Sequence, residues 1–308
     1  MTEADAKAII YGVAIGDALG WPIELMKMDK IQIIYGERGI QEPPDPARIS
    51  DETQTTEAVI KALIDAGDED VDGIMKALTH HLIEWSQSPE NNRAPGHTLT
   101  EAVRTMEAGI SWRESGLPQK GNGSVVRIAP VGYFFQHDLE KLKQVSIAVG
   151  LATHTHPTAV AACVAAAYLV KLGLDEVPVD QFTDRILAIT RDMDEEFGGA
   201  VRKIGHVMGW TDEMAALNYI GAGWMADEAV AMAMYSVMKH PDNFARAVSR
   251  SVNTAGDSDS VGAVAGAVSA AVTGLEGIPP EWINRLENFD RLTELAEKLA
   301  KKRLEVFG

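Results

Sequence analysis

The chain has 308 residues, of which 46% are hydrophobic and 6% aromatic, enough apolar material for a sizeable core. Asp and Glu outnumber Lys and Arg by 45 to 28, so the formal net charge is −17. A surface of that sign repels nucleic acid and anionic membranes, so neither is expected as a partner. The single cysteine, Cys163, excludes an intrachain disulfide and lies in an apolar run typical of a buried side chain.

Residues 1–7 lack the basic and apolar regions of a signal peptide. The apolar run 261–275 is too short to cross a bilayer as a helix. We therefore expect a soluble cytoplasmic protein.

Apolar residues at three- and four-residue spacing predict helices along the whole chain. The predicted helices span residues 4–19, 52–66, 74–85, 99–108, 145–149, 159–172, 181–191, 226–239, 242–252, 261–272 and 292–306. Loops are expected at residues 26–50, 86–98, 112–130 and 192–225. No hairpin pattern, internal repeat or flexible linker is visible, so the sequence predicts a single all-α domain over residues 1–308.

The first predicted helix ends in a Gly-rich turn that carries Asp17 and, seven residues later, Glu24. An Asp near a helix end and a Glu on a surface are both common, so this pattern alone predicts no site.

Two other predicted helices begin with clustered oxygen ligands. Ser50 precedes Asp51 and Glu52, which is ordinary N-cap chemistry, but such a helix turn also aims its oxygens in one direction. Asp257, Asp259 and Ser260 precede a helix made of small apolar residues. Carboxylates at the edge of a core are costly unless a cation neutralises them, and clustered oxygens suit Mg²⁺ or Mn²⁺.

The spacing after Asp257 excludes an EF-hand, because the twelfth position is Val268 and not the required Glu. If the two helix starts face each other, they form a two-metal centre.

Two further segments indicate ligand binding. Residues 121–124 read Gly-Asn-Gly-Ser, whose glycines allow a close backbone approach to phosphate, although neither a Walker loop nor a Rossmann fingerprint is present. His154 and His156 have no third zinc ligand nearby, and Pro157 indicates a helix start. We expect His154 to hydrogen-bond a ligand.

The remaining histidines show no ligand pattern. His80, His81 and Glu84 do not form a His-Glu-x-x-His motif and are expected to be solvated or at the core edge. His97 has no partner pattern either.

Taken together, these motifs resemble the ADP-ribosylglycohydrolase family, the relatives of dinitrogenase-reductase-activating glycohydrolase. The matching segments are residues 12–20 with Glu24, 50–54, 93–98, 121–130, 153–157, 223–229 and 256–266. They cover nearly the whole chain in the family's order.

The resemblance implies the all-α fold of that family and a site for two Mg²⁺ or Mn²⁺ ions beside an ADP-ribose cleft. The implied metal ligands are Ser50, Asp51, Glu52, Asp257, Asp259 and Ser260. Glu24 matches a glutamate that approaches the metals and the ribose, so it is the expected acid/base, with Asp51 second. The implied substrate-binding residues are Gly121, Asn122, Gly123, Ser124 and His154.

Two positions depart from the family pattern. Glu52 stands where the family usually has Asp, which keeps the charge but moves the carboxylate by one methylene. Thr254 stands where relatives often have His.

The expected activity is metal-dependent hydrolysis of the C1″ glycosidic bond that joins ADP-ribose to a protein or small-molecule acceptor, with ADP-ribose as product. Two alternatives remain: an inactive ADP-ribose-binding or structural relative, and a phosphohydrolase that cleaves the pyrophosphate. The sequence indicates neither the acceptor, the leaving-group acid nor the oligomeric state.

Overall fold

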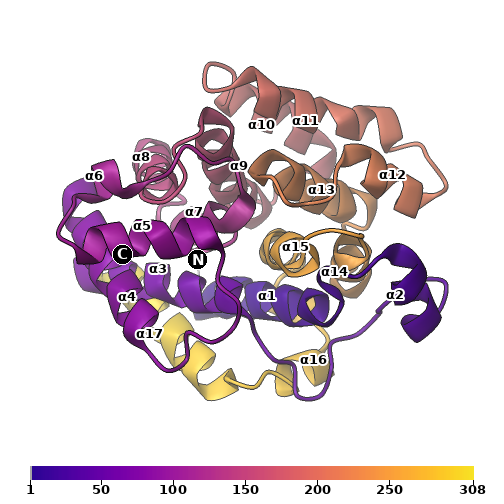
Figure 1. The fold of residues 1–308 in the computed structure, drawn as a ribbon, viewed down its shortest axis with the longest axis horizontal. Coiled ribbons are helices and arrows are strands. Elements are labelled where there is room, and N and C mark those ends of the chain that lie inside the picture. Colours follow the sequence, from indigo (N-terminus) through magenta and orange to yellow (C-terminus); the bar gives the residue numbers. More distant parts are fainter. Residues whose placement is uncertain (1) are drawn as a thin grey trace.

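The computed structural model describes residues 2–308, and the regular structure in this part of the chain is helical, with three isolated bridges and no β-strand (Figure 1). The α-helices are α1 (Glu3–Gly20), α2 (Met28–Tyr35), α3 (Asp51–Ala66), α4 (Val71–Gln87), α5 (His97–Glu107), α6 (Trp112–Ser115), α7 (Ala129–Phe134), α8 (Leu139–Leu151), α9 (Pro157–Leu174), α10 (Phe182–Ile189), α11 (Glu195–Val207), α12 (Glu213–Ile220), α13 (Ala226–Lys239), α14 (Phe244–Val252), α15 (Ser258–Thr273), α16 (Pro280–Asn284) and α17 (Phe289–Phe307). Four short 3₁₀ turns join them: η1 (Trp21–Ile23), η2 (Asn122–Ser124), η3 (Val179–Gln181) and η4 (Leu275–Gly277).

The predicted all-α class is confirmed, but three of the predicted loops contain helices. Residues 26–50 hold α2, residues 112–130 hold α6 and the first two residues of α7, and residues 192–225 hold α11 and α12. In α11 the apolar residues Phe197, Val201 and Ile204 follow helical spacing and are buried, while three glycines lower its intrinsic helix propensity. Packing of the apolar face therefore outweighs propensity in this segment.

Helix α15 lies at the centre of the molecule, where it contacts α1, α9, α13 and α14 (Figure 1). Every residue from Ser258 to Ala271 is buried. Helix α9 is long and apolar enough to cross a bilayer, but 72% of it is buried inside the protein, as in a core helix. The buried apolar residues from Ala6 to Leu299 form one cluster around these helices.

A seam of small residues brings α1 and α15 into backbone contact. Gly12, Gly16 and Gly20 lie one turn apart on α1 and face Gly266, Gly262 and Ser258 of the antiparallel α15. A Cβ atom at any of the three α1 glycines would overlap backbone atoms of the residue opposite. Only glycine allows this approach. The seam consequently sets the C-terminal end of α1 beside the N-terminal end of α15.

Asp17 fixes the start of α3 to the same place. Its fully buried carboxylate accepts hydrogen bonds from the backbone N–H of Ser50 at 2.9 Å and of Thr53 at 3.1 Å. It also accepts one from the Thr53 hydroxyl at 2.5 Å. These donors are the free N–H groups of a helix N-terminus. One end of α1 and the starts of α3 and α15 therefore meet at one point.

Candidate active site

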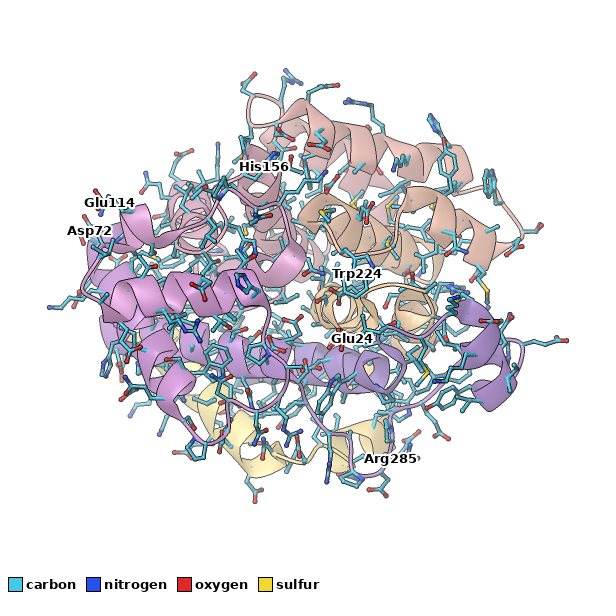
Figure 2. All side chains as sticks on the ribbon, viewed as in Figure 1. Glu24, Asp72, Glu114, His156, Trp224 and Arg285 are labelled. Atoms are coloured by element: carbon cyan, nitrogen blue, oxygen red, sulfur yellow. The ribbon has the colours of Figure 1, made fainter. Side chains whose placement is uncertain are left out.

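A cavity of about 250 Å³ opens where these three helix ends meet. It is lined by Glu24, Asp51, Glu52, Ala94, Gly96, His97, Thr98, Leu99, Gly121, Asn122, Gly123, His154, Trp224, Asp257 and Asp259. Glu24 and Trp224 lie close to each other near the middle of the molecule in Figure 2. The cavity therefore gathers most of the residues that the sequence singled out, from segments far apart in the chain.

Five carboxylates share this cavity. Asp51 and Glu52 come from the first turn of α3, Asp257 and Asp259 from the start of α15, and Glu24 from the residue after η1. Carboxylate oxygens of Glu24, Asp257 and Asp259 lie within 4.8 Å of one another. None of the residues lining the cavity is Lys or Arg. The site therefore carries a concentrated negative charge with no Lys or Arg among its lining residues.

The charge and the burial shift the pKa of these carboxyl groups upward. Burial, followed by the charges of Asp257 and Asp17, raises the pKa of Glu24 to about 7. Burial and the charge of Asp17 do the same for Asp51, whose pKa is also about 7. For Glu52 and Asp259, burial and the adjacent aspartate raise the pKa well above its ordinary value. Low-dielectric surroundings and like charges both disfavour ionisation, so the cluster favours the binding of a cation.

The donor atoms fit a hard divalent cation. All five side chains offer carboxylate oxygens, which are the ligands that Mg²⁺ and Mn²⁺ prefer. The N-termini of α3 and α15 also point their partial positive ends at the cluster, which helps to hold carboxylates there.

The two serines of the predicted metal set make hydrogen bonds within the protein. The Ser50 hydroxyl accepts from the backbone N–H of Glu52 at 3.2 Å, which confirms it as the N-cap of α3. The Ser260 hydroxyl donates to the Glu52 carboxylate and so joins the starts of α15 and α3. Neither serine lines the cavity. In this structure Glu52, at the position where the family usually has Asp, is held by Ser260.

Asn122 orients one of the carboxylates. Its side-chain amide donates to the Asp257 carboxylate at 2.8 Å and to the carbonyl oxygen of Gly223 at 2.6 Å. Both amide hydrogens are thereby used, so its side chain can offer a ligand only its oxygen. The Asn122 side chain thus holds Asp257 in place, while its role as a substrate-binding residue stays a prediction.

His154 is held by a buried hydrogen-bond chain. The Arg127 guanidinium, fully buried, donates to the Thr153 hydroxyl at 2.5 Å, and that hydroxyl lies 2.8 Å from His154 Nδ1. Arginine can only donate, so the Thr153 hydroxyl accepts from Arg127 and its own proton is left for another acceptor. This arrangement favours donation from the Thr153 hydroxyl to His154 Nδ1. His154 Nε2 then carries the proton and lies on the side of Gly121 and Gly123.

The charge state of His154 is set by its surroundings. Burial, followed by the charge of Arg127, lowers the pKa of His154 to about 3. The ring is therefore neutral at physiological pH, and in that state its protonated nitrogen can donate a hydrogen bond.

Two predicted features fall outside the cavity. Ser124 is fully buried and does not line it, because η2 turns this residue into the core. His156 accepts from the backbone N–H of Thr158 and is the N-cap of α9. The predicted helix start at Pro157 is confirmed.

A model of the family described as ADP-ribosylglycohydrolase matches residues 2–306 of the chain. The protein belongs to the ADP-ribosylglycohydrolase family. The resemblance recognised in the motifs is thereby confirmed.

Named relatives align over most of the chain. An uncharacterized protein of Archaeoglobus fulgidus is 25% identical over 99% of this chain and 98% of its own length. The ADP-ribosylarginine hydrolase Tri1 of Serratia proteamaculans is 26% identical over 96% of this chain and 78% of its own. The ADP-ribosyl-[dinitrogen reductase] glycohydrolase of Rhodospirillum rubrum is 25% identical over 92% and 90%. The relatives support an activity on ADP-ribosyl groups in general.

A solved structure described as an ADP-ribosylglycohydrolase-related protein complex shares the fold. It superposes with a TM-score of 0.77 and 22% identity over 98% of both chains. The all-α architecture of this chain is thus that of the ADP-ribosylglycohydrolase family.

Several residues of the cavity had no role in the sequence analysis. Trp224 and His97 line it although neither was assigned a function, and Asp17 holds the α3 start from outside it. Trp224 lies in one of the segments that match the ADP-ribosylglycohydrolase family, and so does His97. The family match was therefore the one signal in the sequence that could have placed Trp224 and His97 at the site, because nothing in their local sequence indicates a ligand.

Proposed function

We propose that the protein is a divalent-metal-dependent hydrolase that cleaves the C1″ glycosidic bond between ADP-ribose and an acceptor. The observation that carries the proposal is the cavity in which five carboxylates converge without a Lys or Arg among the lining residues. Family membership supplies the ADP-ribosyl group as the substrate class.

The proposed metal ligands are Asp51, Glu52, Asp257 and Asp259, with Ser50 and Ser260 as further candidates. Carboxylate oxygens of Asp257, Asp259 and the neighbouring Glu24 lie within 4.8 Å of one another. Bound Mg²⁺ or Mn²⁺, two ions in the proposal, supplies Lewis-acid polarisation and makes water a better nucleophile near neutral pH.

Glu24 is the proposed proton acceptor, with Asp51 as the second candidate. Glu24 lies outside the regular helices, after η1, and is only partly buried, so it can reach both the cavity and its opening. In the proposed step, water adds its oxygen to C1″ and gives a proton to the Glu24 carboxylate. The C1″–acceptor bond breaks with its electron pair on the acceptor, which then takes up a proton. ADP-ribose and the unmodified acceptor result, so the reaction consumes one water.

Carboxylates around the cavity also suit the transition state of such a reaction. Positive charge develops at the anomeric carbon as the glycosidic bond lengthens, and nearby anionic groups stabilise it.

The other side of the cavity is the proposed ADP-ribose subsite. Gly121 and Gly123 leave the His154 ring uncovered, since a Cβ at either position would lie 3.4–3.5 Å from it. The His154 Nε2–H is therefore available to donate to an oxygen of the ligand. Trp224, 37% exposed at the cavity, offers a flat apolar surface beside that donor.

Arginine is the acceptor that we propose to test first, because two of the relatives are named ADP-ribosylarginine hydrolases. A cationic guanidinium also suits an opening lined by acidic side chains. The arginine can belong to a protein or to a small molecule. We also propose that the enzyme is cytoplasmic, as expected from the sequence.

The test is a panel of defined ADP-ribosyl adducts on arginine, serine, a nucleobase and an acetyl group, each incubated with Mg²⁺ or Mn²⁺. We expect release of ADP-ribose from at least one adduct, loss of activity on chelation, and a fall of at least about 100-fold in Asp257→Asn. Asp180→Asn is the control, because Asp180 is exposed and does not line the cavity. Metal-independent ADP-ribose binding without any turnover would instead identify an inactive relative.

A further inference from the structure

A second group of metal-binding side chains lies on α4, away from the acidic cavity. His80, His81 and Glu84 offer ligand atoms that all lie within 4.8 Å of one another. Glu84 Oε1 is 3.3 Å from His80 Nε2, and Glu84 Oε2 is 3.0 Å from His81 Nδ1. His80 and Glu84 are four residues apart, so the two side chains share one face of the helix.

These separations match the spacing of ligands around one ion. Zinc–nitrogen and zinc–oxygen bonds of about 2.0–2.1 Å place two ligands of a tetrahedral site about 3.3 Å apart. The Glu84 carboxylate thus lies at ligand distance from both imidazoles. His80 and Glu84 are 65% and 58% exposed as side chains, so an ion in solution can reach them.

The second nitrogen of His81 is also held. His81 Nε2 lies 2.7 Å from the Asp65 carboxylate on α3. A neutral imidazole that donates there has a lone pair on Nδ1. That lone pair faces an oxygen of Glu84, and two acceptors in contact repel unless a cation or a proton lies between them. A carboxylate that holds the far nitrogen of a metal-binding histidine is a recurrent feature of zinc sites.

The donor set separates this group from the acidic cavity. Imidazole nitrogen favours Zn²⁺, Cu²⁺, Ni²⁺ and Co²⁺, whereas the all-oxygen cavity favours Mg²⁺ and Mn²⁺. Glu84 and Asp65 together carry two negative charges, enough to balance a divalent ion. Asp65 lies 14 residues along α3 from Asp51, which is about 20 Å.

We propose that His80, His81 and Glu84 bind a divalent transition metal of the zinc type, with Asp65 holding His81 in place. The ion would tie α4 to the C-terminal part of α3, since His81 contacts Asp65 across the two helices. Because ligands that bind only the folded state stabilise it, Zn²⁺ raises the melting temperature of the protein.

The test is calorimetric titration of the whole protein with Zn²⁺ in excess Mg²⁺, which occupies the all-oxygen cavity. We expect one equivalent of Zn²⁺ whose affinity falls at least tenfold in His80→Ala and in Glu84→Gln. Asp65→Asn should weaken binding by about 10–100-fold. His137→Ala, another exposed histidine, is the matched control and should change nothing.

A second readout is the visible spectrum of the Co²⁺-loaded protein, in which imidazole coordination gives bands that His80→Ala removes. Equal Zn²⁺ affinity in wild type, His80→Ala and Glu84→Gln would overturn the proposal. So would the absence of any Zn²⁺ binding in excess Mg²⁺. Hydrolysis of ADP-ribosyl adducts depends on other residues, so failure of this proposal and failure of the proposed activity are separate results.

Discussion

The glycine seam between α1 and α15 allows a test of how the fold positions the site. Gly12 is three turns away from Glu24 along the chain and does not line the cavity. In Gly12→Ala the new Cβ would lie 2.8 Å from Ala270 Cβ and 2.8 Å from the carbonyl carbon of Gly266. Carbon atoms in contact are about 3.5–4.0 Å apart, so the two helices must separate by about 1 Å.

The expected energies follow from that separation. Forcing one methyl group into a packed core costs about 1–3 kcal/mol, and the higher helix propensity of Ala offsets about 1 kcal/mol. We expect Gly12→Ala to lower the free energy of unfolding by about 2 kcal/mol at most. The same separation moves Asp257 and Asp259 away from Glu24, and a misplacement of about 1 Å costs about 100-fold in activity.

The assay combines denaturant unfolding with calorimetric Mn²⁺ titration and initial rates of ADP-ribose release. Gly199→Ala is the matched control, because Gly199 lies in α11 with no atom within 4 Å of the added Cβ. It should gain about 0.5–1 kcal/mol of stability and keep its metal affinity and activity. Gly12→Ala with wild-type Mn²⁺ affinity and wild-type rate would show that the seam does not position the carboxylates.

Three other predictions concern the site itself. Thr153→Val removes the hydroxyl that orients the His154 ring and should weaken ADP-ribose binding about tenfold. Thr153→Ser should restore the affinity, and nitrogen NMR of the imidazole reports the tautomer of His154 directly. Asn122→Ala removes the hydrogen bond that holds the Asp257 carboxylate and should lower Mn²⁺ affinity at least tenfold with little change in melting temperature. The pKa values of Glu24 and Asp51 are raised to about 7 in the metal-free folded protein, so protonation of these carboxyl groups stabilises the fold. This stabilisation is fully present below about pH 4 and is lost as the pH rises through about 7. Mg²⁺ should therefore raise the melting temperature more at about pH 7.5 than at about pH 5, and an equal shift at both values would contradict this assignment.

Local chemistry was sufficient to predict part of the site. Ser50 caps α3 and Asp257 caps α15, and in both cases the capping residue stands directly before two or more oxygen-bearing side chains. The sequence signal of a helix N-terminus lies in a few adjacent residues, so it can be recognised in a single sequence. The meeting of these two helix starts is not local, because it depends on Asp17 and on the α1–α15 seam.

Other parts of the site could not be predicted because they depend on long-range packing. The chain from Arg127 through Thr153 to His154 joins residues from different elements, and only the folded core places the guanidinium against the hydroxyl. The side-chain amide of Asn122 donates to Asp257, which lies 135 positions away in sequence, and no local pattern around Asn122 indicates that partner. Hydrogen-bond partners at such separations leave no periodic signal.

Helices α11 and α12 were missed for a different reason. Helix α12 has only eight residues, too few to show a long periodic pattern, and the three glycines of α11 lower the helix propensity of a segment whose apolar residues do follow helical spacing. Both are stabilised by contacts with neighbouring helices. Their first turns are capped by Asp194 and Asp212, which was the local signal that a search for caps would have found.

The most direct test of the proposed activity is mass-spectrometric identification of the products formed from an ADP-ribosylarginine peptide in the presence of Mg²⁺. We expect two products, ADP-ribose and the unmodified peptide, with none formed after chelation or by Asp257→Asn. Release of AMP, with phosphoribose left on the arginine, would show that the pyrophosphate is the bond cleaved and would contradict the proposed reaction.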